Sequence, residues 1–222
     1  MERRKKWAAQ LVPNLCMVFF SVIALFPLCW VFLTAFQPTD QGVSFVLPDI
    51  LAKGFTLRNF ERVSELIPLW QNFWNSVVVS VVGTVLTLFF CALAGYAFAK
   101  FQFPGRDMLF LLLLFTMVIP QEVCIVPLFV VMRRLGWIDS MLSLIIPRAA
   151  TAVGIFYMRQ YISQYPTEII EQARIDGCRE FSIFCRIVAP GITPALASWG
   201  AISLIARWND FMLPMIFLRD PQ

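Results

Sequence analysis

Three ionisable side chains, Arg148, Arg207 and Asp210, each interrupt a run of apolar residues. A charge in apolar surroundings is costly, so such a residue pairs with an opposite charge or contacts a polar ligand on its path. For Arg148 both roles are open: a structural pair with Glu122, or a place on a pathway. Arg207 and Asp210 have the i, i+3 spacing that allows an ion pair on one helix.

Trp208 and Asn209 lie between these last two charges and suggest a binding chemistry. An aromatic ring offers a flat apolar face to a sugar, and an amide offers directional hydrogen bonds. The alternative is an aromatic belt at a membrane surface, where tryptophan is enriched. The sequence leaves both open.

Catalytic chemistry is not indicated. The 222 residues include no histidine, and six cysteines stand at positions 16, 29, 91, 124, 178 and 185. Cys178 and Cys185 lack the spacing of metal ligands. We find no glycine-rich phosphate loop and no nucleophile with a neighbouring base. The sequence therefore predicts neither an enzyme nor a metal or cofactor site.

The elements that must hold these residues are membrane helices. The chain is 59% hydrophobic, 15% aromatic and only 14% charged, which is far from the composition of a soluble domain. About 20 apolar residues cross a bilayer. We predict an all-α integral membrane protein with five transmembrane helices, within residues 7–39, 66–99, 108–132, 140–158 and 191–218.

A polar segment, residues 163–190, separates the last two apolar runs. It reads SQYPTEIIEQARIDGCREFSIFCRIVAP. We predict a helix over 167–176, a turn in which Gly177 takes a positive φ, and a second helix over 179–188 that Pro190 ends. The i, i+3, i+4 pattern places one apolar face on the second helix, formed by Phe181, Phe184, Ile187 and Val188. The alternative is an ordinary solvated loop.

The spacing of Glu171-Gln172-Ala173, Gly177, Ile187 and Pro190 resembles the Glu-Ala-Ala loop of binding-protein-dependent ABC importer permeases. Residues 56–60, 94–106 and 208–214 resemble further segments of the carbohydrate-uptake class, which includes maltose-type and glycerol-phosphate-type permeases. This resemblance implies that 163–190 is a coupling loop seated on a cytoplasmic ATPase. The implied coupling residues are Glu168, Glu171, Ala173, Asp176, Gly177, Ile187 and Pro190. The implied translocation path includes Arg148, Trp208, Asn209 and Asp210.

The resemblance also implies the partners: cytoplasmic ATPase subunits, a second homologous permease subunit and an extracytoplasmic solute-binding protein. Residues 1–222 would form one transmembrane domain in a bacterial inner membrane, with 163–190 as a loop within it. Lysine and arginine are more frequent on the side of the amino terminus and of this loop, which places both in the cytoplasm. The start MERRKK then precedes a retained first helix.

The expected function is import of a sugar or related polar solute, driven by ATP hydrolysis in separate subunits. The alternative is a secondary transporter coupled to an ion gradient, which would favour repeats and midplane carboxylates. A neutral sugar and an anionic solute such as a sugar phosphate or glycerol phosphate remain open. The resembled permeases carry one more helix after the last predicted span, so the chain either is truncated or ends outside.

Overall fold

The computed structural model describes residues 2–38 and 54–218, and within them it contains helices, turns and no strand. The predicted all-α class is confirmed. The chain divides into two compact units, residues 1–70 and 71–222. We describe each unit by itself.

The first unit contains α1 (Glu2–Ala35) and α3 (Arg58–Leu66). Residues 13–35 of α1 are long and apolar enough to cross a membrane, with Pro27 inside the helix. The sequence suggests Thr56 as the cap of a short helix, but the N-cap position of α3 is Leu57, which makes no side-chain cap hydrogen bond. The hydroxyl of Thr56, one residue earlier, accepts a hydrogen bond from the Arg58 N–H at 3.2 Å. The sequence also predicts an external loop over residues 37–70, of which residues 39–53 lie outside the described residues.

The second unit is organised around α4 (Leu69–Lys100). A stripe of small residues faces inward along this helix, formed by Ser80, Gly83, Thr84, Thr87, Cys91, Ala92 and Gly95. Gly95 is required by close packing, because a Cβ there would lie 2.7 Å from the Cβ of Met158. The sequence predicts close helix packing from the small residues Ser76, Ser80, Gly83, Thr84, Ala92, Ala94 and Gly95. Five of these seven are buried, whereas Ser76 is exposed and Ala94 is half-buried.

The third and fourth predicted spans are each broken. The third consists of α5 (Arg106–Thr116) and α6 (Gln121–Arg134), bent by 101°. The fourth consists of α7 (Leu142–Ile145), the 3₁₀ helix η2 (Ile146–Arg148) and α8 (Ala152–Ser163), bent by 43°. Pro120 precedes the first residue of α6, where a proline ends the preceding helix rather than continuing it.

The polar segment contains α9 (Thr167–Ile175), followed by α10 (Glu180–Ile183), the π-helix η3 (Phe184–Val188) and α11 (Ala189–Gly191). The predicted helix over 167–176 is confirmed to within one residue. Pro190 does not end the second helix as predicted, because it occupies an early position of α11, where a missing N–H is tolerated.

The predicted apolar face of this second helix is partly wrong. Phe181 is exposed, whereas Ile183 and Phe184 are buried. The π-turn explains the difference, since its wider repeat shifts the inward face away from the 3.6-residue pattern.

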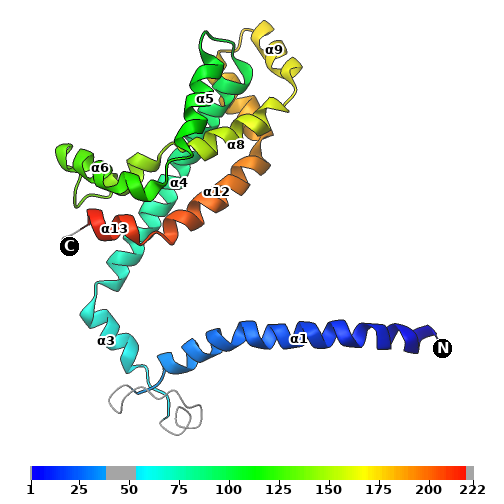
Figure 1. The fold of residues 1–222 in the computed structure, drawn as a ribbon, viewed down its shortest axis with the longest axis vertical. Helices are drawn as coiled ribbons and strands as arrows, with labels where there is room; N and C mark the ends of the chain where they lie inside the picture. Colours follow the sequence, from blue (N-terminus) through cyan, green and yellow to red (C-terminus); the bar gives the residue numbers. More distant parts are fainter. Residues whose placement is uncertain (1, 39–53, 219–222) are drawn as a thin grey trace. The chain divides into compact units, whose positions relative to one another are not determined.

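The last predicted span begins with α12 (Thr193–Trp208), which bends by 81° from the preceding segment, and ends in α13 (Met212–Phe217). In Figure 1, α4, α5, α8 and α12 form one bundle, with α9 at one end and α6 and α13 at the other. The main core joins these helices through Cys91, Ala92, Tyr96, Ile155, Met158, Ile162, Ile170, Ala173, Ile183, Phe184, Val188, Ile192 and Ala195.

Among the described residues, two helices can cross a membrane alone, and as many as five spans result if each bent pair counts as one. The number five therefore stays a prediction. A multi-pass membrane protein is nevertheless supported by the lengths and composition of these helices.

Candidate functional site

Arg207 is the centre of a buried polar network in the second unit. It is only 6% exposed, although it carries a charge. Its Nη2 atom donates to Thr87 Oγ1 at 2.8 Å and to the Arg148 carbonyl at 2.7 Å, and its Nη1 atom donates to the Leu144 carbonyl at 3.3 Å. The two carbonyls belong to α7 and η2, where the helix is interrupted. Arg207 therefore supplies donors to backbone groups that the break leaves without regular helix partners.

Gly83 makes room for this arginine. A Cβ at Gly83 would lie 2.5 Å from Arg207 Nη1 and 2.7 Å from Cζ. Thr87, one helical turn further along α4, has its Oγ1 2.8 Å from both the Gly83 and the Arg148 carbonyl oxygens, so its hydroxyl can donate to either. Sequence reasoning assigned no role to Thr87 and gave Gly83 only a packing role.

The side chain of Arg148 forms an ion pair with Asp210. Both side chains are partly enclosed, with exposures of 24% and 17%. The pairing that we considered for Arg148 with Glu122 is therefore corrected, and so is the expected pair between Arg207 and Asp210. The second correction has a local cause: α12 ends at Trp208, so Asp210 lies beyond the helix and not one turn along it.

Asp210 also contacts the first turn of the next helix, which begins two residues later. Its Oδ1 accepts a hydrogen bond from the Leu213 N–H at 3.3 Å, at the start of α13. A carboxylate at this position satisfies a free donor of the first turn. Asp210 therefore joins α12, α13 and η2 at one point.

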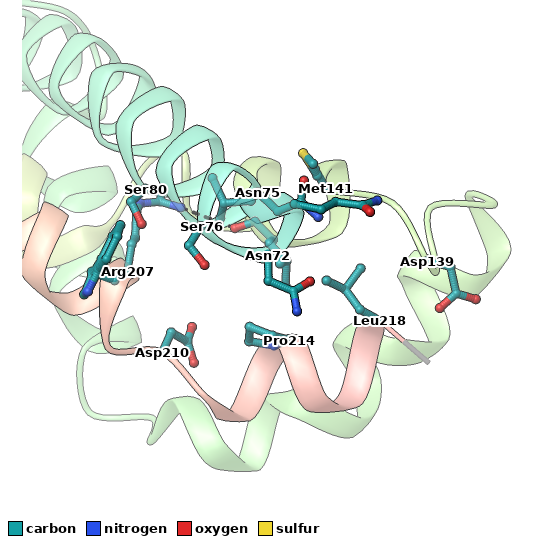
Figure 2. A pocket seen from close by; sticks show the side chains of 14 residues that line it. Asn72, Asn75, Ser76, Ser80, Asp139, Met141, Arg207, Asp210, Pro214 and Leu218 are labelled. Atoms are coloured by element: carbon teal, nitrogen blue, oxygen red, sulfur yellow. Dashed lines mark hydrogen bonds between the residues drawn. The ribbon is translucent and has the colours of Figure 1, made fainter. Parts of the chain in front are cut away.

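A cavity of about 770 Å³ opens between the first turns of α4 and the α12–α13 segment. Figure 2 shows Ser76 and Ser80 of α4 facing Asp210 and Pro214. The lining is rich in amides and hydroxyls: Gln71, Asn72, Asn75, Ser76, Val79, Ser80, Asp139, Met141, Leu144, Arg207, Trp208, Asp210, Pro214 and Leu218. Its volume is within the range of small-molecule sites.

A second cavity, of about 580 Å³, has Arg148 and Asp210 in its wall together with Gln121 and Glu122. Asp210 lines both cavities, whereas Arg148 lines only the second of these two. The ion pair thus lies where polar walls of the two cavities meet.

Trp208 and Asn209 differ in the cavities that they line. Trp208 lines the larger cavity and meets the Phe73 ring edge to face, with ring centroids 6.0 Å apart. Both residues line an apolar groove of about 220 Å³, but Asn209 does not line the larger cavity. The Nδ2 atom of Asn209 donates to the Ile205 carbonyl at 2.9 Å.

The predicted turn between the two helices of the polar segment is confirmed. Gly177 has φ +80°, and a Cβ there would meet nothing within 4 Å. The strain of another residue at this position would therefore come from the backbone angle alone.

The other predicted coupling residues divide by burial. Glu168, Glu171, Asp176 and Pro190 are exposed, Ile187 is half-buried, and Ala173 is buried against the core. Ile170 is buried beside Ala173, so the remaining face of α9 is open. Their predicted role in coupling stays a prediction.

Contacts that sequence reasoning missed attach α9 to the end of α4. Arg174 forms an ion pair with Glu180, with 2.5 Å between Nε and Oε1, and Tyr96 donates its hydroxyl to Glu180 Oε2 at 3.0 Å. The hydrogen bond that Arg174 donates to the Glu180 carboxylate raises the pKa of Arg174 above its ordinary value. Lys100 Nζ donates to the Tyr165 carbonyl at 2.6 Å and to Thr167 Oγ1 at 2.9 Å.

The Arg148 pair leads to a first prediction. Arg148→Met leaves the Asp210 carboxylate without its cation. We therefore expect the thermal unfolding midpoint in detergent to fall by several degrees. Because the pair is only partly buried, the expected loss in free energy of unfolding is roughly 1 to 3 kcal/mol. Adding Asp210→Asn is expected to recover part of the loss. Adding Glu122→Gln serves as the matched control and is expected to recover nothing. Recovery with Glu122→Gln instead would indicate that Arg148 pairs with Glu122 and would contradict the structure.

Comparison with known proteins identifies the class to which this bundle belongs. The family described as "Binding-protein-dependent transport system inner membrane component" matches residues 91–222, which include the polar segment and the Arg148–Asp210 pair. The chain belongs to this family. It is thus a membrane-embedded permease component of a binding-protein-dependent transport system.

Individual relatives extend the similarity over most of the chain. The arabinooligosaccharides transport system permease protein AraQ of Halalkalibacterium halodurans is 36% identical over 208 residues, covering 91% of this chain and 73% of the relative. The lactose transport system permease protein LacG of Rhizobium radiobacter is 31% identical, covering 90% of this chain and 72% of the relative.

A solved structure also matches. The crystal structure of a bacterial ABC transporter involved in the import of the acidic polysaccharide alginate contains a chain with a TM-score of 0.82 and 28% identity. The match covers 98% of this chain and 77% of that chain. The alternative of an ion-coupled secondary transporter is not favoured by these comparisons.

Proposed function

We propose that this protein is the permease subunit of a bacterial ABC importer that takes up a sugar or related polar solute. The observation that carries the proposal is the 31% to 36% identity, over nine-tenths of the chain, with permeases named for arabinooligosaccharide and lactose transport. ATP hydrolysis is assigned to partner subunits. A second permease subunit and an extracytoplasmic binding protein complete the proposed complex.

The chemistry of the larger cavity supports a neutral solute. Amide and hydroxyl groups of Asn72, Asn75, Ser76 and Ser80 offer directional hydrogen bonds, and Trp208 offers a ring face. The two arginines near the cavities already have partners within the protein. Arg148 forms an ion pair with Asp210, and Arg207 donates hydrogen bonds to two carbonyls and a hydroxyl. An anionic solute would have to displace these partners. We therefore favour a neutral oligosaccharide over a phosphorylated or acidic one.

Within this proposal, the translocation path passes Trp208, Asp210 and the Arg148 pair. Asn209 was predicted to share that path, and it remains a prediction. Its amide is engaged by its own helix, so we expect it to contribute less than Trp208.

The residues 163–190 are proposed to contact the ATPase. The exposed face of α9 carries Glu168, Glu171 and Asp176, while Ala173 and Ile187 hold the segment against the core. Gly177 sets the angle between α9 and α10, and Pro190 lies where the segment turns toward α12. This assignment puts the segment and the amino terminus in the cytoplasm.

The direct test is transport by the assembled complex. The chain, co-expressed with its ATPase, second permease and binding protein, is reconstituted in liposomes, and uptake of a labelled neutral arabino-oligosaccharide is measured. Uptake that requires ATP and the binding protein is the expected result. Uptake driven by an ion gradient in the absence of ATP would contradict the proposal, and preference for an acidic oligouronide would contradict its neutral-solute part.

A second prediction concerns the ring of Trp208. Trp208→Ala is expected to raise the half-saturating solute concentration for transport about fivefold to tenfold, since a ring contact contributes roughly 1 kcal/mol. Trp208→Phe keeps an aromatic face and is expected to be milder. Trp74→Ala removes an exposed tryptophan of α4 outside the cavity lining and is the matched control.

Asn209→Leu belongs in the same series, with a smaller expected rise than Trp208→Ala. Equal transport by Trp208→Ala and the unmodified complex would remove Trp208 from the path and return it to the aromatic-belt alternative.

A further inference from the structure

The C-terminal end of α4 is attached to both ends of α9. At the first end, Lys100 Nζ donates to the carbonyl of Tyr165 and the hydroxyl of Thr167, which begins α9. At the second end, Arg174 in the last turn of α9 is joined to Tyr96 of α4 through the carboxylate of Glu180. Two anchors a helix apart fix both the position and the direction of α9 relative to α4.

The carboxylate of Glu180 is shared between its partners. Its Oε1 lies 2.5 Å from Arg174 Nε, and its Oε2 accepts from Arg174 Nη2 at 3.3 Å and from the Tyr96 hydroxyl at 3.0 Å. This is a two-point contact with the guanidinium, which fixes angle as well as distance. A displacement of α9 therefore moves Glu180, and Glu180 pulls on Tyr96.

Tyr96 is the rigid end of this connection. It is 3% exposed, and its ring lies 5.4 Å from the Phe101 ring and 5.7 Å from the Phe184 ring, measured between centroids. The cation of Arg174 lies 5.5 Å from the centroid of Phe101. Because the tyrosine ring is enclosed, it cannot rotate freely, and a displacement of its hydroxyl also displaces the backbone of α4.

α4 continues without a break from this connection to the larger cavity. Tyr96 and Ser80, which lines the cavity, are separated by 16 residues of one helix, a distance of about 24 Å at 1.5 Å per residue. Gly83 and Thr87, which contact Arg207, lie between them. One continuous helix thus joins the α9 anchor, the buried arginine and the cavity wall.

We infer that Glu180 is a positioning residue, and that the connection Tyr96–Glu180–Arg174 transmits movement of α9 to α4 and so to the solute cavity. This inference rests on the proposed contact of α9 with an ATPase. It adds to that proposal the route by which the contact reaches the cavity, through residues that are not part of the cavity lining.

The test compares solute transported with ATP hydrolysed in the same reconstituted complex, using the neutral arabino-oligosaccharide as the probe. Tyr96→Phe removes only the hydroxyl and keeps the packed ring. We expect it, and Glu180→Gln, to lower the ratio of transport to hydrolysis at least threefold while the ATPase stays bound. Tyr161→Phe, at an exposed tyrosine of α8, is the matched control and is expected to leave the ratio unchanged.

A double variant tests whether the residues act together. Tyr96 and Arg174 act through the same carboxylate, so Tyr96→Phe combined with Arg174→Met is expected to lower the ratio by less than the product of the two single effects. Arg174→Lys keeps the charge and is expected to restore part of the ratio lost in Arg174→Met.

The outcomes separate the inference from the proposed function. If the unmodified complex shows no ATP-driven uptake, the proposed function fails. If it transports normally, and Tyr96→Phe and Glu180→Gln reduce transport and hydrolysis in equal proportion or leave both unchanged, the connection is only structural and the inference alone is overturned.

Discussion

Arg207→Met is expected to destabilise the second unit strongly, lowering the thermal unfolding midpoint of the detergent-solubilised protein by roughly 5 to 15 °C, the equivalent of about 2 to 4 kcal/mol. The methionine fills much of the same volume but donates no hydrogen bond. The Leu144 carbonyl then loses its donor from Arg207, and the Arg148 carbonyl keeps only what the Thr87 hydroxyl can give. A carbonyl at a helix break inside a membrane protein is costly to leave without a hydrogen-bond donor.

Two further variants separate loss of hydrogen bonds from loss of charge. Arg207→Lys keeps the charge but cannot reach all three acceptors at once, so an intermediate midpoint is expected. Gly83→Ala keeps Arg207 in the sequence but adds a Cβ that would lie 2.5 Å from its Nη1 atom. The guanidinium must then move away from its hydrogen-bond acceptors. Arg133→Met, at an exposed arginine of α6, is the matched control. A midpoint for Arg207→Met within 2 °C or so of the control would show that the network does not hold the break together.

The parts of the site that could be predicted from sequence were those determined by neighbouring residues. The glycine turn is one example, because Gly177 stands between two short helical patterns and only glycine takes its φ readily. The charges in apolar runs were also recognised as residues that need partners. Their partners were not identified, since Arg148 and Asp210 are 62 residues apart and candidates were chosen by closeness along the chain.

The buried connections could not be predicted from the sequence for the same reason. Tyr96 and Glu180 are 84 residues apart, and a tyrosine near a helix end carries no sign of its acceptor. The small residues of α4 did signal close packing, but not that Gly83 accommodates a buried guanidinium. The inward face of the predicted second helix was misassigned at Phe181, in α10, because the π-turn that follows it has no reliable sequence pattern.

Gly177→Val is expected to lower transport and solute-stimulated ATP hydrolysis together, and by more than any substitution on α4. Gly177 has φ +80°, a region that a β-branched residue enters only at a cost of about 1 to 3 kcal/mol. Since a Cβ would meet no atom within 4 Å, the valine itself fits, and the strain is relieved by turning α9 relative to α10. Turning α9 misplaces Glu168 and Glu171 for the proposed ATPase and also strains the Arg174–Glu180 ion pair that crosses the turn.

The measurements are uptake, ATP hydrolysis stimulated by the binding protein with its solute, and the amount of ATPase that co-purifies. Uptake and stimulated hydrolysis are expected to fall at least tenfold, with ATPase held more weakly, while the chain still inserts.

Gly136→Val is the matched control. Gly136 also has a positive φ, of +71°, with open space at its Cβ, but it follows α6, which lies far from α9. It bears similar backbone strain and is expected to leave transport and stimulated hydrolysis close to those of the unmodified complex. Gln172→Ala, on the exposed face of α9, favours helix and is expected to be harmless. Normal transport by Gly177→Val with its ATPase firmly bound would show that residues 163–190 are not the coupling element, whatever the fate of the control.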